Sequence, residues 1–161
     1  MPLKPNFYQY INNYKMVSIK QINENDIDLC FELDSKTISL WSKKQWTDEF
    51  KKDGTRIFGL IISNLIIGIC VIQIVLDEAQ INYFVVRKKF REMGVGSYLM
   101  SYLIESCEKL NLSKLLLEVS ERNVTAEKFY NQFDFSTVGF RKNYYKDGSA
   151  AILKEKKLTT K

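Results

Sequence analysis

The chain has 161 residues, of which 45% are hydrophobic and 27% charged, a balance typical of one globular domain rather than a disordered or fibrous protein. Its net charge of +5 comes from scattered lysines, so we favour an ordinary basic surface over direct nucleic-acid readout. No apolar run reaches the roughly 18 residues that a transmembrane helix needs, and we expect no membrane partner.

The first 15 residues, MPLKPNFYQYINNYK, differ in character from the rest of the chain. They lack the apolar core and small-residue cleavage site of a secretory signal. Their prolines and asparagines indicate a flexible N-terminal arm. We therefore predict an arm over residues 1–15, a folded domain over residues 16–157, and a cytoplasmic location.

The chain contains three cysteines, Cys30, Cys70 and Cys107, and no histidine. The cysteines are far apart and form no C-x-x-C pair, which argues against a disulfide framework and against a zinc site. We expect no metal. Without histidine, acid or base chemistry must use a carboxylate, tyrosine, lysine or cysteine.

The first half of the chain predicts a strand, two helices and three more strands. A strand over residues 16–22 leads into a helix over residues 25–36. Ser42 and Gln45 have the S-x-x-Q spacing of a capping box, so a second helix should begin at Ser42. Residues 55–62, 65–76 and 79–86 are predicted to form consecutive antiparallel strands joined by tight turns.

The second half alternates helices and strands before a closing hairpin. A helix over residues 94–109 has one apolar face, and KLLLEVS (114–120) resembles a strand covered on both faces. Another helix begins near Asn123, and FSTVGFRKNYY forms a hairpin with AAILKEK across the turn KDGS. The expected fold is a single α/β domain with a mixed, mostly antiparallel central sheet of about seven strands and helices on both faces.

The segment REMGVGSYLM (91–100) places two glycines between a predicted strand and a predicted helix. Backbone N–H groups at such a helix start attract phosphate. It lacks the G-x-x-x-x-G-K-[ST] sequence of a P-loop and the G-x-G-x-x-G of a dinucleotide fold. The remaining R-x-x-G-x-G pattern is equally compatible with phosphate binding and with glycines that only shape a turn.

Further segments resolve this ambiguity. Arg91 to Gly96 resembles the acetyl-coenzyme A pyrophosphate loop of the GNAT N-acetyltransferases, and the order of elements is similar to theirs. VLDEA, LLLEVSERNVTAEKFYNQFDF and GFRKNYYKDGSAAIL resemble the RimI-type bacterial enzymes, over about residues 17–154 in all. The resemblance implies acetyl transfer from acetyl-CoA to a primary amine, namely the N-terminal alanine of a small-subunit ribosomal protein. The alternatives are a small amine or another protein N-terminus as acceptor, and a non-catalytic acetyl-CoA sensor.

The resemblance also implies which residues bind the cofactor. The backbone of Phe84, Val85 and Val86 would pair with the pantetheine arm, and Asn123 would contact it as well. Arg91, together with Arg87 and Lys88, either helps with an outlying phosphate or is an ordinary solvated residue. The N–H groups that would hold the pyrophosphate belong to Glu92, Met93, Gly94, Val95, Gly96 and Ser97.

Two residues are candidates for catalysis. Glu118 interrupts an apolar strand, where a charge is costly unless it is paired or wetted, and it matches the base of the RimI-type enzymes. Tyr130 matches their general acid, since a phenol can protonate a leaving thiolate. Cys107 lies on the apolar face of a helix, so core packing is expected for it instead of a nucleophile's role.

Aromatic residues are the candidates for the acceptor site. By resemblance, Trp41, Tyr144 and Tyr145 would line the peptide groove, although Trp41 is equally suited to be the hydrophobic staple of the helix that begins at Ser42. Asp134 stands where the RimI-type enzymes usually have glycine. Aspartate tolerates a left-handed turn better than most residues, so the turn should survive there.

Overall fold

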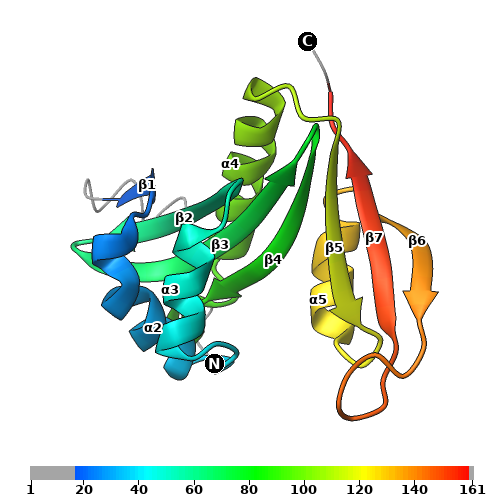
Figure 1. Cartoon of the computed structure of the whole chain (residues 1–161), viewed down its shortest axis with the longest axis horizontal. Helices are drawn as coiled ribbons and strands as arrows, with labels where there is room; N and C mark the ends of the chain where they lie inside the picture. Colours follow the sequence, from blue (N-terminus) through cyan, green and yellow to red (C-terminus); the bar gives the residue numbers. More distant parts are fainter. Residues whose placement is uncertain (1–16, 160–161) are drawn as a thin grey trace. The chain divides into compact units, whose positions relative to one another are not determined.

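A computed structural model describes residues 17–159, and the predicted N-terminal arm at residues 1–15 lies outside these (Figure 1). The order of helices and strands agrees with the sequence prediction, with a short 3-10 turn added before α2 and another before the glycine segment. The elements are β1 (Val17–Gln21), η1 (Glu24–Asp26), α2 (Ile27–Ser35), α3 (Lys43–Lys51), β2 (Thr55–Ile62), β3 (Leu65–Val75), β4 (Glu78–Val86), η2 (Lys88–Phe90), α4 (Val95–Lys109), β5 (Lys114–Ser120), α5 (Val124–Asn131), β6 (Ser136–Arg141) and β7 (Ala151–Lys157).

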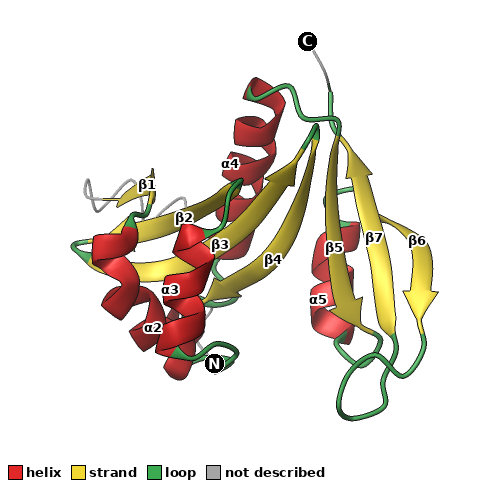
Figure 2. Ribbon diagram, viewed as in Figure 1, coloured by secondary structure: helices red, strands yellow, loops and turns green. Residues whose placement is uncertain are grey.

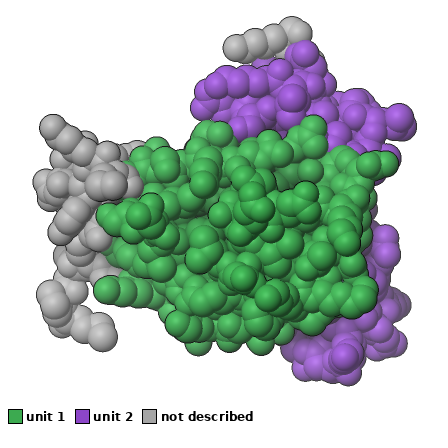
Figure 3. Space-filling view, turned by 60° about the vertical axis from the view of Figure 1, so that its left-hand side comes forward, with its two compact units in different colours: residues 1–73, 83–103 green, residues 74–82, 104–161 purple. Residues whose placement is uncertain are grey.

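The strands form one seven-stranded sheet in the order β1-β2-β3-β4-β5-β7-β6 (Figure 2). The pairs β1–β2, β2–β3, β5–β7 and β6–β7 are antiparallel, whereas β4 and β5 are parallel. The predicted α/β class, with a mixed and mostly antiparallel sheet, is therefore confirmed. The chain divides into two units, coloured in Figure 3: residues 1–73 with 83–103, and residues 74–82 with 104–161.

The first unit has two clusters of buried side chains. Leu33 of α2 and Trp46 of α3 pack on one of them, together with Ile69 of β3 and Val85 of β4. The other cluster includes Leu60 of β2, with Ile67, Phe90, Met93 and Val95. Helices α2 and α3 thus cover one cluster, and the glycine segment that opens α4 belongs to the other.

The second unit contains β5, and this strand differs from its prediction. Leu115, Leu117 and Val119 are buried, but the alternating positions, Glu118 among them, are only half-buried. Successive side chains of a strand point to opposite faces of the sheet. The strand therefore has one well-covered face, and Glu118 lies on the other.

The closing hairpin is also shorter than predicted. Strand β6 ends at Arg141, so Tyr144 and Tyr145 lie in a loop and not in the strand. Both of their backbone N–H groups donate to the carbonyl oxygen of Ser149, at 3.1 Å each. This local turn removes the two tyrosines from the strand ladder.

Candidate active site

The glycine segment is anchored by side chains and turned by its backbone. Met93 and Val95 are buried, while Glu92 and Gly94 are exposed. Glu92 and Gly94 both have left-handed backbone angles, with φ of 63° and 85°. Helix α4 begins at the next residue, Val95. The segment is therefore a fixed turn that opens the N-terminus of a 15-residue helix, as an anion-binding loop requires.

The end of β4 that precedes this loop extends past its pairing with β5. The parallel ladder runs from the pair Glu78 and Lys114 to the pair Ile81 and Leu117. Strand β4 then continues to Val86. The predicted pantetheine-binding residues 84–86 belong to this last part of the strand.

The arginines near the loop have different surroundings. Arg87 donates to both oxygens of the Glu32 carboxylate, at 3.2 and 2.8 Å, and to the carbonyl oxygen of Ile66. These contacts lower the pKa of Glu32 to about 2, with a smaller contribution from Lys36. Arg87 therefore ties α2 to the sheet. Arg91 is exposed, and its Nε donates to the carbonyl oxygen of Val86 at 3.0 Å.

Sequence reasoning missed a buried carboxylate, Asp34, at the end of α2. Its Oδ1 accepts from the Leu40 N–H and the Tyr83 hydroxyl, at 3.0 and 2.9 Å. Its Oδ2 accepts from the Trp41 N–H at 2.8 Å and from Trp46 Nε1 at 3.3 Å. Burial and the Asp34 carboxylate raise the pKa of Tyr83 far above its usual value. This Asp34 cluster joins α2, the loop before α3, α3 and β4.

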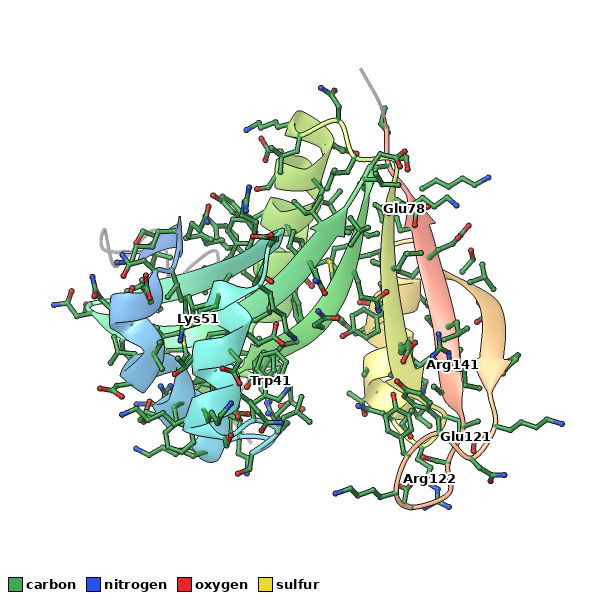
Figure 4. All side chains as sticks on the ribbon, in the orientation of Figure 1. Trp41, Lys51, Glu78, Glu121, Arg122 and Arg141 are labelled. Atoms are coloured by element: carbon green, nitrogen blue, oxygen red, sulfur yellow. The ribbon has the colours of Figure 1, made fainter. Side chains whose placement is uncertain are left out.

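The cluster explains where Trp41 lies. Its ring is half-buried and packs edge-on against Trp46, with the ring centres 4.8 Å apart. It also lies tilted against Tyr83 at 5.0 Å. Ser42 caps α3 with the reciprocal capping box to Gln45 that the sequence predicted. Trp41 therefore packs on the core beside this cap, and Figure 4 labels its side chain.

In the second unit, Glu118 is the centre of a polar and aromatic cluster. Arg141 Nη2 lies 3.4 Å from Glu118 Oε1. The Tyr144 hydroxyl donates to the same carboxylate, and this hydrogen bond raises the pKa of Tyr144. Burial raises the pKa of Tyr145, and the charge of Glu118 adds to the effect. The strand charge that the sequence singled out is thus paired.

The loop over residues 142–150 is fastened to the end of β5. Glu121 makes two hydrogen bonds with Ala150. The backbone N–H of Glu121 donates to the carbonyl oxygen of Ala150 at 3.0 Å, and Oε1 of Glu121 accepts from the backbone N–H of Ala150 at 2.8 Å. The hydroxyls of Ser120 and Ser149 lie 3.0 Å apart. Glu121, Arg122 and Arg141 are labelled at this end of the unit in Figure 4. The loop that carries the two tyrosines is therefore held beside Glu118.

Helix α5 carries two more predicted site residues. Asn123 is its N-cap, as predicted, and accepts from the Ala126 N–H at 3.2 Å. Tyr130 is half-buried, with its ring 5.5 Å from Phe129 and 5.8 Å from Phe135. Asp134 has a φ of 64°, so aspartate takes the left-handed turn after this helix.

The cysteines do not form a reactive or metal-binding site. All three are buried, and none of them forms a disulfide. Burial raises the pKa of the Cys107 thiol to about 12, so the thiolate is scarce near neutral pH, as its predicted core role requires. Within residues 17–159, no group of three or more potential ligands is placed to hold a metal ion. That same range contains no helix long and apolar enough to cross a membrane.

Comparison with known proteins decides the family. Residues 22–135 match the model of the acetyltransferase (GNAT) family, which is most of the chain. The chain belongs to this family. Its members use acetyl-CoA as the cosubstrate, and the chain is an acetyl-CoA-dependent N-acetyltransferase. The residues present fit this group, because the anchored turn at Glu92 and Gly94 opens a helix whose N-terminus favours pyrophosphate.

Individual family members give a finer comparison. The chain is 32% identical to a [ribosomal protein bS18]-alanine N-acetyltransferase of Haemophilus influenzae, over 81% of this chain and 88% of the relative. It is 27% identical to the enzyme of that name from Escherichia coli, with the same coverage. The crystal structure of the ribosomal-protein-S18-alanine N-acetyltransferase from Escherichia coli superposes with a TM-score of 0.84 at 25% identity, covering 91% of this chain and 96% of that chain.

Proposed function

We propose that this acetyltransferase modifies the N-terminal alanine of ribosomal protein bS18. Support comes from relatives of that name, which match over about four fifths of the chain and most of their own length. The observation that carries the proposal is the Glu118 cluster, where a carboxylate lies beside two tyrosines on a fastened loop. A cytoplasmic location is part of this proposal, since ribosomal proteins are found there, and no nucleic-acid readout is required.

The cofactor is proposed to bind through backbone groups. N–H groups of residues 92–97 would hold the pyrophosphate at the start of α4, where the helix dipole favours negative charge. The β4 backbone over residues 84–86 would pair with the pantetheine arm, because this part of the strand lies beyond the ladder with β5. Asn123 and Arg91 are proposed as further contacts.

Glu118 is proposed as the general base. An α-amino group has a pKa of about 7.7 to 8, so a minority of it is already neutral near pH 7. The Glu118 carboxylate would take the proton from the acceptor's ammonium group, directly or through a water. The freed lone pair then attacks the carbonyl carbon of the thioester that acetyl-CoA supplies.

Tyr130 is proposed as the general acid. When the carbon–sulfur bond breaks, the sulfur leaves as a thiolate and needs a proton. The Tyr130 hydroxyl would donate it, and a phenol of pKa about 10 is reasonably matched to a thiol of pKa about 8.5. Its ring makes edge contacts with Phe129 and Phe135, which would limit the directions that the hydroxyl can take.

The acceptor is proposed to contact Tyr144 and Tyr145, and Trp41 is the third proposed wall residue. The exposed ring of Tyr144 is in edge-to-face contact with Tyr145, at 5.1 Å between centres. Aromatic side chains in this arrangement suit the short apolar side chain and backbone of an alanine-starting peptide. Trp41 is half-buried, so only part of its ring is available for such a contact.

The test is acetylation of a defined peptide. The protein is incubated with acetyl-CoA and a peptide that carries the N-terminal sequence of bS18, and intact mass is measured with time. We expect the gain of one acetyl group on the α-amino group. The same peptide with a blocked N-terminus and an internal lysine should remain unmodified. Faster acetylation of a small amine or of other N-termini would favour the alternative acceptors, and no transfer to any amine would favour an acetyl-CoA sensor.

A further inference from the structure

The pairing of Arg141 with Glu118 reaches across a whole strand. Arg141 pairs with Ala151 of β7, and Ala151 pairs with Ser120 of β5. Directly paired residues share a face of the sheet, and Glu118, two positions from Ser120, lies on that face too. The small side chain of Ala151 leaves room for the guanidinium to pass over β7. An arginine at the end of an edge strand therefore reaches the proposed base.

Arg141 contacts the substrate side of the cluster as well. Its guanidinium carbon lies 5.6 Å from the centre of the Tyr144 ring, in a cation–π arrangement. Tyr144 in turn donates its hydroxyl hydrogen to Glu118. Tyr145 also lies near enough for the charge of this carboxylate to raise its pKa, although burial contributes more. The three side chains Glu118, Arg141 and Tyr144 form a closed triangle.

The ion pair between Arg141 and Glu118 is weak enough for a ligand's ammonium group to replace Arg141. It is a single oxygen contact at 3.4 Å, and the Arg141 side chain is 56% exposed, against 24% for Glu118. Exposed ion pairs of this kind are weak, because water screens them. A ligand ammonium group carries the same charge and can replace the guanidinium at the carboxylate at small cost.

We propose that Arg141 is a positioning residue for acetyl transfer, which holds the Glu118 carboxylate beside Tyr144 and yields one carboxylate oxygen to the acceptor's ammonium group. This inference rests on the proposed role of Glu118 as base. Arg141 itself neither gives nor takes a proton. It keeps the Glu118 carboxylate from rotating away before the acceptor arrives. After the acceptor's ammonium group has replaced Arg141, the hydrogen bond from Tyr144 still holds the carboxylate in place.

The test combines Arg141→Ala with a double-mutant cycle. We expect kcat/KM for the alanine-starting peptide to fall about threefold to thirtyfold, with KM for acetyl-CoA unchanged and thermal unfolding unaltered. Arg141→Lys should retain more of this kcat/KM than Arg141→Ala, and added ethylguanidinium should restore part of the kcat/KM lost in Arg141→Ala. In the Glu118→Gln background, Arg141→Ala should cost less than about twofold, because the group it positions is gone.

Arg122→Ala is the matched control. Arg122 lies at the same end of the unit and is similarly exposed, but it pairs with Asp147 instead, at 3.3 Å. Arg122→Ala should leave kcat/KM for the peptide within about twofold and show no response to ethylguanidinium. Full additivity of Arg141→Ala with Glu118→Gln, or an unchanged kcat/KM for the peptide in Arg141→Ala, would overturn the inference. Failure of the bS18 peptide as a substrate would instead overturn the proposed function, and the cycle would then be measured on whichever amine is acetylated.

Discussion

Tyr83 donates its hydroxyl hydrogen to the buried carboxylate of Asp34 over 2.9 Å, and this bond joins β4 to the end of α2. The other three donors to the carboxylate are two backbone N–H groups and an indole, from Leu40, Trp41 and Trp46. All four are neutral. A buried charge is costly unless it is fully hydrogen-bonded, so these four bonds are what allow a carboxylate to stay inside the first unit.

Replacing Asp34 with asparagine should therefore destabilise the protein strongly. In asparagine an NH2 group replaces one of the two carboxylate oxygens, each of which accepts two hydrogen bonds. Because NH2 cannot accept from these donors, two of the four bonds would be lost. We expect a loss of about 2 to 4 kcal/mol in the free energy of unfolding, measured by urea denaturation. Asp28→Asn is the control: the Asp28 side chain is 79% exposed and pairs with Lys43, so its loss should stay within about 0.5 kcal/mol. Equal losses in the two variants would contradict this account.

The cofactor loop is best tested at Gly96. Substitution of Gly94 would strain its left-handed backbone, with φ of 85°, whatever the ligand does. Gly96 lies in the first turn of α4, where glutamate is tolerated by the backbone but brings bulk and negative charge to the proposed pyrophosphate. Gly96→Glu should weaken coenzyme A binding by about a hundredfold or more in calorimetry, with the fold intact.

The same glutamate farther along the helix serves as the control. Ser101 is exposed on α4, about one and a half turns beyond Gly96. Ser101→Glu adds the same charge away from the helix start and should leave coenzyme A affinity within about threefold. If Gly96→Glu binds as tightly as the unmodified protein, the loop does not hold the cofactor.

Features that depend on residues close together in the sequence were predicted correctly, whereas contacts between residues far apart in the sequence were not. The capping box of Ser42 and Gln45 depends on residues three positions apart, so the sequence alone contains it. The importance of Asp34 depends on donors that lie between 6 and 49 residues away. Nothing adjacent to Asp34 indicates that they converge on it, and a polar residue near a helix end is ordinarily exposed.

The Glu118 cluster shows the same limit. The apolar run around Glu118 predicted a residue that needed a partner, but it did not predict Arg141. That pairing depends on the β5-β7-β6 order, which places the two residues on strands separated by β7. Tyr144 was predicted to lie in the closing hairpin, within the segment FSTVGFRKNYY, yet the turn onto Ser149 ends the ladder first.

Tyr130→Phe tests the proposed acid. Phenylalanine keeps the ring contacts with Phe129 and Phe135 and removes only the hydroxyl. We expect kcat to fall by roughly a hundredfold or more, with little change in coenzyme A affinity. Tyr102→Phe is the control, since Tyr102 packs its ring on Phe58 at 5.8 Å, and its kcat should stay within about twofold. A parallel loss of cofactor affinity in Tyr130→Phe would make Tyr130 a structural residue.

The ion pair of Glu32 with Arg87 predicts a pH-dependent stability. The pKa of Glu32 is lowered to about 2, chiefly by its hydrogen bonds with Arg87 and then Lys36. A depressed pKa stabilises the folded state fully above the unfolded value of about 4.3, and this contribution is lost as pH falls toward 2. Because the Glu32 side chain is 37% exposed, screening reduces the contribution to about 1 kcal/mol.

Glu32→Gln should therefore lower the free energy of unfolding by about 1 kcal/mol at pH 7, and the difference should shrink steadily between about pH 4.3 and pH 2. Urea denaturation at a series of pH values measures it. Glu105→Gln breaks a more exposed pair with Lys109, 64% and 72% exposed, and should change stability little at any pH. A difference for Glu32→Gln that is equally large at pH 2 would show that the effect comes from packing and not from charge.

The proposed base makes the sharpest prediction. In the unmodified enzyme, kcat/KM on an alanine-starting peptide should rise with pH, because the amine must lose a proton before it attacks. Glu118→Gln keeps the size of the side chain and an oxygen that can accept from Tyr144, but it cannot take that proton. At pH 7 its kcat/KM should fall about a hundredfold to ten-thousandfold. It should recover in part above the pKa of the amine, where most of the acceptor is already neutral and a base is needed less.

The pH profile separates this role from a structural one, since a misplaced loop over residues 142–150 would lower activity equally at every pH. Near-normal kcat/KM at pH 7 in Glu118→Gln would mean that the carboxylate is not the base, and that its contacts with Arg141 and Tyr144 only hold the loop.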